Sequence, residues 1–145
     1  MKRKYITIKI TGRRYIGQEA DEDMEFVTDG TMYERKGARY LIYDESEFSG
    51  IPGCKTSLKL TDDMLRLKRI GKNVDTYGSE LIFEKGKRFV SSYHTPFGSI
   101  DMEILTKDIK KNLTPDGLGK ITLDYDISLK GMAEGRNEID IEILQ

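Results

Sequence analysis

Apolar and polar residues alternate along most of this chain, and the alternation is clearest in its last third. Every second residue is apolar over residues 121–129, and the same pattern returns over 139–143. Successive side chains of a β-strand point to opposite faces, so a period of two predicts strands with one buried face and one wet face. The chain is therefore predicted to be built mostly of half-buried strands.

Short turn signals separate the predicted strands. Lys36-Gly37 precedes a strand predicted over 38–45, and Thr61-Asp62-Asp63 separates 55–60 from 64–70. Further turns are predicted at Glu84-Lys85-Gly86-Lys87 and at Pro96-Phe97-Gly98. Glycine, proline and aspartate favour tight turns, and connections this short leave no room for the crossovers that parallel strands need. We therefore expect an antiparallel meander of about eight to ten strands.

A meander of this many twisted strands favours closure into a barrel, because closure removes the exposed edges of the sheet. The predicted fold class is thus an all-β, antiparallel meander barrel, with residues 1–145 as a single domain. A sandwich of two sheets is the alternative. One short helix is predicted near residues 107–113, because Ile109 and Leu113 lie four residues apart and Pro115-Asp116-Gly117 would end it.

Composition narrows the classes of partner and the compartment. The 24 Lys and Arg residues balance 25 Asp and Glu residues, so no overall field favours nucleic acid or an anionic membrane. Cys54 is the single cysteine, which excludes an internal disulfide and paired-thiol zinc spacings. The N-terminal residues lack the apolar run of a signal peptide, and no stretch approaches the roughly 20 apolar residues of a membrane helix. We expect a cytoplasmic protein without a membrane partner.

A resemblance to a known family spans nearly the whole chain. It is carried by Tyr40-Leu41-Ile42-Tyr43-Asp44-Glu45, Thr56-Ser57-Leu58-Lys59, Arg69-Ile70-Gly71, Phe83, Gly86, Tyr93-His94-Thr95-Pro96-Phe97-Gly98 and Thr106. In these residues the chain resembles the DUF1934 family of YwiB-like bacterial proteins, with Asp44 as a conservative departure from an expected glutamate. The resemblance implies a lipocalin-like, or calycin-like, barrel of intracellular bacterial origin. It implies no catalytic residues, because the biochemical role of the family is not established.

Strand parity assigns a mixed set of side chains to the barrel interior. The polar and aromatic members of this inward set are Tyr43, Glu45, Thr56, Arg69, Tyr93, Thr95, Thr106 and Tyr125. A buried charge is costly unless it is paired or solvated, so Glu45 and Arg69 are expected to be partners or to line a wet cavity. The set predicts a pocket for a small, partly apolar ligand, and the alternative is that these groups plug one end of the barrel.

No catalytic, metal or cofactor site is predicted. His94 is assigned to the outer face without partners, and Cys54 lies in a predicted loop with nothing nearby to lower its pKa. The pairs Asp124 with Asp126 and Asp21 with Asp23 lack the glycine pattern of a calcium loop and are interpreted as solvated faces.

Two functions remain open at this stage. The first is a non-enzymatic barrel that binds a small hydrophobic or amphipathic ligand. The second is a structural or interaction module that binds a protein or RNA partner through the barrel exterior. Basic residues interleaved with tyrosines favour the RNA version of the second, namely Arg66, Lys68, Lys72, Lys2, Arg3 and Lys4.

Overall fold

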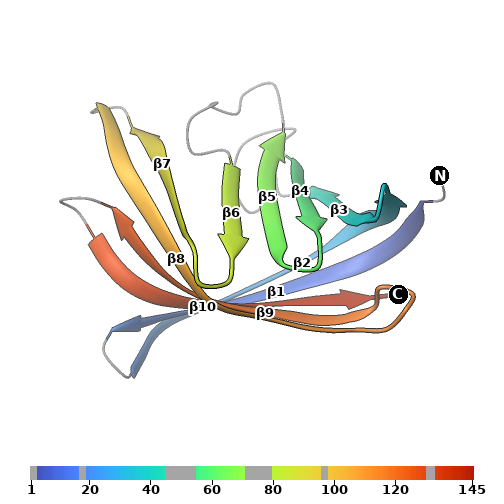
Figure 1. Cartoon of the computed structure of the whole chain (residues 1–145). Helices are drawn as coiled ribbons and strands as arrows, with labels where there is room; N and C mark the ends of the chain where they lie inside the picture. The colour runs from blue at the N-terminus through green and yellow to red at the C-terminus, as the bar shows by residue number, and fades with distance from the viewer. Residues whose placement is uncertain (1–2, 17–18, 45–54, 71–79, 96–97, 130–132) are drawn as a thin grey trace.

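Every regular element in the described part of the chain is a β-strand. The computed structural model describes residues 3–16, 19–44, 55–70, 80–95, 98–129 and 133–145 (Figure 1). Ten strands follow one another along the chain: β1 Lys4–Ile16, β2 Glu19–Arg35, β3 Ala38–Asp44, β4 Lys55–Leu60, β5 Met64–Ile70, β6 Glu80–Glu84, β7 Arg88–Thr95, β8 Gly98–Leu113, β9 Gly119–Leu129 and β10 Ala133–Leu144. No helix long and apolar enough to cross a membrane occurs among these residues.

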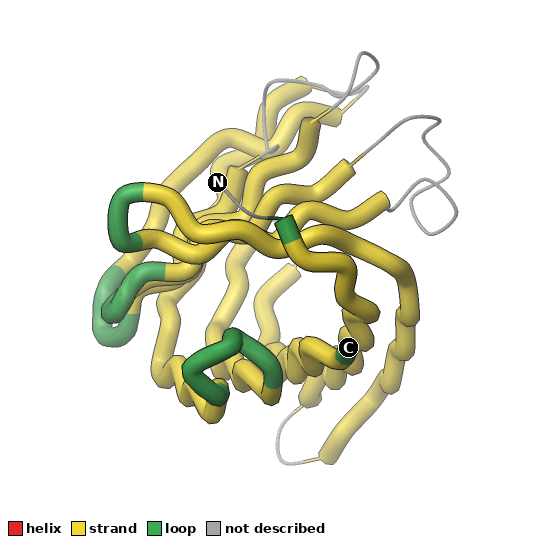
Figure 2. The backbone as a smooth tube through the Cα atoms, turned by 90° about the vertical axis from the view of Figure 1, so that its right-hand side faces the viewer, coloured by secondary structure: helices red, strands yellow, loops and turns green. Residues whose placement is uncertain are grey.

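The ten strands form one antiparallel sheet that curls into a nearly closed barrel (Figure 2). Their order is β6-β5-β4-β3-β2-β1-β10-β9-β8-β7, so nearly every strand pairs with its neighbours in sequence. The first and last strands also pair, along Thr7 to Tyr15 of β1 and Arg136 to Leu144 of β10. The predicted meander barrel is therefore confirmed, and the two-sheet sandwich is not what the chain forms.

The seam of the barrel lies between two consecutive strands, β6 and β7, which diverge from their common turn (Figure 1). The turn itself is where the sequence predicts it, with Gly86 at a φ of 77° and Lys87 N–H donating to the Glu84 carbonyl at 3.0 Å. It bonds to β8 across the seam. Gly86 N–H donates to the Thr106 carbonyl at 2.8 Å, and Thr106 N–H donates to the Lys87 carbonyl at 3.4 Å. These two hydrogen bonds hold the turn between β6 and β7 against β8 and so close this end of the seam.

The helix predicted near residues 107–113 is wrong, because β8 continues as a strand to Leu113. A β-bulge between Thr106 and Asp108 shifts the register by one residue, after which Ile109 pairs with Leu123 and Leu113 with Gly119. A bulge inserts one extra residue and turns the following side chains to the opposite face. The four-residue spacing of Ile109 and Leu113 fits a strand as well as a helix, because four is a multiple of the strand period.

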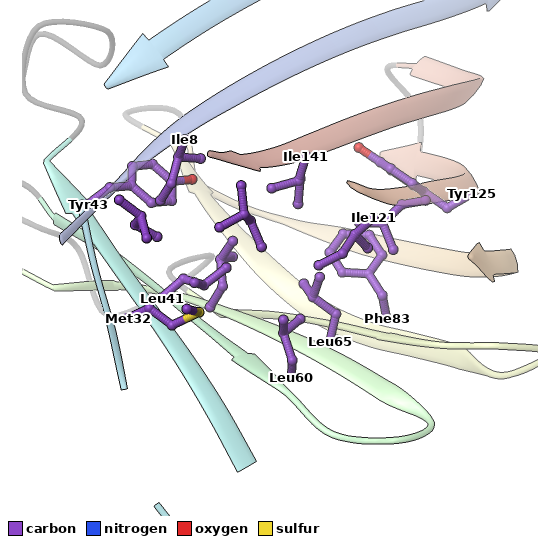
Figure 3. Close-up of a cluster of buried hydrophobic side chains, with 14 of the residues drawn as sticks. Ile8, Met32, Leu41, Tyr43, Leu60, Leu65, Phe83, Ile121, Tyr125 and Ile141 are labelled. Atoms are coloured by element: carbon purple, nitrogen blue, oxygen red, sulfur yellow. The ribbon is translucent and has the colours of Figure 1, made fainter. Parts of the chain in front are cut away.

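Inward residues from both halves of the sheet form one core. The most deeply buried apolar side chains include Ile8, Leu41, Leu58, Leu65, Phe83, Ile104, Ile121 and Ile143. Figure 3 shows Ile8, Leu41 and Phe83 within this core. Removing a side chain of this size from water contributes about 1.5–3 kcal/mol to folding, so this core is the main source of stability. The predicted hairpin at Lys36-Gly37 is present, with φ of 52° and 77°, and positive φ at both central residues matches the right-handed twist of the flanking strands.

A candidate binding site in the barrel interior

The barrel interior contains a cavity of about 170 Å³. Its described lining is almost entirely aliphatic and aromatic, with one arginine at its rim, and consists of Ile10, Met24, Phe26, Tyr43, Leu58, Leu65, Leu67, Arg69, Leu81, Phe83, Leu123, Tyr125, Ile139 and Ile141. The lining comes from strands on opposite sides of the barrel, so the cavity exists because the sheet curls back on itself. A concave apolar space with a few polar groups is the usual composition of a small-molecule site.

Three residues of the predicted inward set lie side by side on one wall of the barrel. Thr56 on β4 pairs with Tyr43 on β3 and with Arg69 on β5. Tyr43 and Thr56 are buried, whereas Arg69 is exposed at the rim of the cavity. The Tyr43 ring packs against Phe26 with centroids 6.1 Å apart. Tyr43 and Arg69 line the cavity, and Thr56 lies between them in the sheet.

Tyr125 and Thr106 form a second pair of the predicted set, opposite each other on β9 and β8. Tyr125 is only 8% exposed, and burial raises its pKa to about 12. Its side chain lines the cavity. Its hydroxyl gives the mostly apolar wall a group that can donate or accept a hydrogen bond.

The two threonines of the set are buried more deeply and do not line the cavity. Each is 1% exposed, and within the described residues neither hydroxyl has a hydrogen-bond partner. Thr106 uses its backbone to hold the turn between β6 and β7, which gives it a structural role. The set thus contributes Tyr43, Arg69 and Tyr125 to the cavity wall.

The remaining predicted residues fall outside what the structure describes. Glu45 follows the end of β3 and lies outside the described residues, so its pairing with Arg69 stays a prediction. Tyr93 and Thr95 are in β7, where their backbones pair with Ile100 and Gly98, but their side chains are outside the description. The side chain of His94 and the whole of Cys54 are likewise outside it.

A second hollow of about 210 Å³ adjoins the first and includes two inward polar residues that were not predicted. Arg14 on β1 and Asn137 on β10 pair directly across the ladder and both line it. The two hollows share Met24, Tyr125 and Ile139 as lining residues. Strand parity could have found both polar residues, because Arg14 continues the face of Ile6, Ile8 and Ile10 and Asn137 continues that of Ile139.

The barrel end formed by the turns after β2, β4, β6 and β8, here the turn end, is plugged by polar side chains. The Arg39 guanidinium binds the Glu34 carboxylate and donates to the Pro115 carbonyl at 3.2 Å. The Lys111 ammonium donates to the Thr61 carbonyl, and burial lowers the pKa of Lys111 while Asp62 and Asp63 partly oppose this shift. A polar plug therefore does exist, but it is built from residues outside the predicted inward set.

On the acidic outer face, Asp124 is bound by an arginine. Asp124 accepts two hydrogen bonds from Arg136, at 2.9 Å from Nε and 2.8 Å from the terminal nitrogen. These bonds, with the positive charge of Arg136, lower the pKa of Asp124. Within the described ranges, no three His, Cys, Asp or Glu side chains converge in a metal-binding group.

Comparison with known proteins identifies the family. The crystal structure of the ywiB protein from Bacillus subtilis is similar, with a TM-score of 0.66, 20% sequence identity and coverage of 97% of this chain and 92% of that one. At this identity the likeness shows the shared fold alone. No curated protein matches the sequence. The model of the family described as a domain of unknown function, DUF1934, matches residues 8–141, and the chain therefore belongs to the DUF1934 family.

Proposed function

We propose that this protein is a non-enzymatic, cytoplasmic binder of a small, partly apolar ligand held in the barrel interior. The observation that carries the proposal is the mostly apolar interior cavity of about 170 Å³, whose wall includes the buried side chain of Tyr125. An apolar cavity of about 150 Å³ is large enough to hold benzene. The expected ligand therefore has an apolar body of about six to ten non-hydrogen atoms and one group that hydrogen-bonds to Tyr125.

Arg69 and Arg14 support a polar or anionic head group. Arg69 lines the rim of the cavity, and Arg14 lines the adjoining hollow. A guanidinium binds carboxylates through paired hydrogen bonds. A ligand with its apolar body against Leu67 and Ile139 would place a head group within reach of one of these side chains. The lipocalin-like resemblance supports an interior ligand by analogy only, because one fold can serve several functions.

The first test is native mass spectrometry of protein purified under mild conditions from its own host, with the intact mass compared with the denatured mass. A reproducible extra mass is expected. A bare chain would leave a weak ligand to be tested directly, by thermal shift and NMR titration with phenol, benzoate and indole as probes.

Two variants with the same chemical change locate the site. Tyr125→Phe removes the hydroxyl inside the cavity, and Tyr5→Phe removes one from a side chain that is 83% exposed on the outside. Loss of one hydrogen bond costs about 0.5–1.5 kcal/mol, so Tyr125→Phe is expected to weaken binding of the probes about two- to tenfold. Tyr5→Phe should leave binding unchanged. Equal behaviour of the two variants, or no binding of any probe together with a bare native mass, would contradict the proposal.

A further inference from the structure

Charged side chains are distributed unevenly over the outer surface of the sheet. Basic and aromatic side chains lie at outward positions of β1 to β5 near the turn end and on the residue before β1. We name this surface the tyrosine face, and it consists of Arg3, Tyr5, Tyr33, Arg35, Tyr40, Lys59, Arg66 and Lys68. Among the described residues at these outward positions and their direct cross-strand neighbours, Glu80 is the carboxylate, and it binds Arg66 at 2.8 Å. Glu25, Asp29 and Asp44 lie farther along the same strands, away from the turn end.

The opposite outer surface, on β8 to β10, is rich in carboxylates. Its outward carboxylates are Asp101, Glu103, Asp108, Asp124, Asp126, Glu134, Glu138, Asp140 and Glu142, and its outward cations are Lys107, Lys110, Lys120 and Arg136. The formal net charge of −1 therefore combines a basic face with an opposite face on which carboxylates outnumber cations. The near-zero net charge of the whole chain gave no reason to expect nucleic-acid binding. The fold, however, gathers basic residues that are scattered along the sequence onto one face of the sheet.

The aromatic rings of the tyrosine face are ordered by strand pairing. Tyr33 and Tyr40 face each other across β2 and β3 and stack with centroids 5.0 Å apart and planes within 9°. The Arg3 guanidinium lies 5.4 Å from the centre of the Tyr33 ring, and the Lys59 ammonium lies 5.8 Å from that of Tyr40. Two stacked rings thus lie between two cations across four adjacent chain segments.

Cross-strand aromatic pairs can simply stabilise a sheet, but the exposure of Tyr5 is not explained by such a role. Its side chain is 83% exposed, next to the stacked pair, with its backbone opposite Thr31. A large aromatic ring held in water on a rigid strand gains little stability where it is. It offers a flat surface on which a planar group can stack.

We propose that the tyrosine face binds single-stranded nucleic acid. Exposed rings that stack on bases, flanked by cations that neutralise phosphates, are how sheet surfaces hold single strands. The bases of a duplex are stacked on one another, so the exposed rings can stack on the bases of a single strand more readily than on those of a duplex. This function is independent of the interior cavity, because the tyrosine face lies on the opposite side of the sheet from the cavity lining.

The test is fluorescence anisotropy with a labelled oligouridine of about twelve nucleotides, within the usual site size of such proteins. Binding is expected at about 50 mM salt. If about three phosphates are contacted, affinity should fall about 20-fold between roughly 50 and 200 mM salt. A duplex of the same length should bind more weakly than the single strand.

Matched variants distinguish stacking from general attraction. Tyr5→Ala is expected to weaken binding about tenfold, and Tyr5→Phe to retain it, because base stacking needs the ring and not the hydroxyl. Lys59→Gln should weaken binding and flatten the salt dependence, whereas Lys107→Gln on the acidic surface should change neither. Circular dichroism and thermal unfolding of each variant show whether it is folded.

Several results would overturn the proposal. They are no binding of the oligonucleotide at low salt, equal binding of heparin, equal losses for Tyr5→Ala and Tyr5→Phe, or an equal effect of Lys107→Gln. Occupation of the face by a protein partner, with no affinity for the oligonucleotide, would also overturn it.

Discussion

The ring of Phe83 meets the ring of Tyr125 edge-on, with centroids 4.9 Å apart and planes at 63° (Figure 3). Phe83 belongs to β6 and Tyr125 to β9, which are not neighbours in the sheet. Only closure of the barrel brings them together. The contact therefore spans the interior near the seam and forms part of the cavity wall, so it ties the stability of the closed barrel to the shape of the candidate site.

Phe83→Ala is expected to be among the most destabilising single substitutions in this core. Phe83 is 1% exposed, and truncation of a buried phenylalanine to alanine usually costs about 3–5 kcal/mol. Val90→Ala is the control, since Val90 is 67% exposed and surface changes stay within about 0.5 kcal/mol. Urea unfolding of the two variants measures the difference. Similar losses for both would mean that Phe83 does not hold the barrel closed.

Tyr125 should make stability fall with pH in the alkaline range. Below pH about 10 the hydroxyl is protonated in both the folded and the unfolded chain, so it adds no pH dependence. Burial raises the folded pKa to about 12, so between these values the unfolded chain releases a proton that the folded chain keeps. The free energy of unfolding should therefore decrease by about 2–3 kcal/mol over this window.

The variant Tyr125→Phe has no phenolic proton to release, so its stability can be compared with that of the parent at each pH. The decrease in stability between pH about 10 and 12 should be smaller in the variant than in the parent, measured by chemical unfolding at each pH. Tyr5→Phe should keep the decrease of the parent. If the parent and Tyr125→Phe show the same pH profile, Tyr125 ionises in the folded state as an exposed tyrosine does.

Two glycines on the inner face should respond differently to alanine. A Cβ at Gly30 would lie 2.7 Å from the Ile42 carbonyl oxygen and 2.9 Å from Cδ1 of Ile8, so β2 or β3 would have to shift. A Cβ at Gly12 would meet only Cε of Met24, at an ordinary 3.5 Å. Gly30→Ala is expected to cost about 1–3 kcal/mol, and Gly12→Ala to lie within about 1 kcal/mol of the parent. Thermal unfolding of the two variants measures this difference in stability. A Gly30→Ala variant as stable as the parent would contradict the prediction.

Local patterns predicted the strands, their inner faces and most turns. The alternation that carries Ile121, Leu123 and Tyr125 is set by the strand period, and the turn at Lys36-Gly37 by the positive φ that glycine adopts freely. These features depend only on residues close together in the sequence. The inward placement of Tyr43, Thr56 and Arg69 follows from the same period, and the register then brings them into one row.

Long-range relationships were not predictable in the same way. The bulge after Thr106 leaves no local signal, and without it the spacing of Ile109 and Leu113 fits a helix equally well. The position of the seam depends on the pairing of β1 with β10, which is decided by curvature of the whole sheet. The separation of basic and acidic outer faces also depends on which strands lie side by side.

The ion pair of Asp124 with Arg136 should contribute to stability only above acidic pH. Two hydrogen bonds from Arg136 lower the pKa of Asp124 in the folded state, so the folded carboxylate holds its proton less tightly than the unfolded one. The stabilisation is therefore present above the ordinary aspartate pKa of about 4 and is lost as pH falls through the lowered value. Because both side chains are partly exposed, its size should be below about 1 kcal/mol.

Arg136→Gln separates this charge effect from packing. The Arg136 guanidinium also lies 4.9 Å from the centre of the Tyr15 ring, a contact that does not depend on the charge of Asp124. If the ion pair carries the stabilisation, the variant is less stable than the parent at pH about 7, and the two converge as pH falls well below about 4. Arg136→Lys, which keeps the charge without the two-pronged geometry, should lie between them. A stability difference that stays constant with pH would instead assign the contribution of Arg136 to its contact with Tyr15.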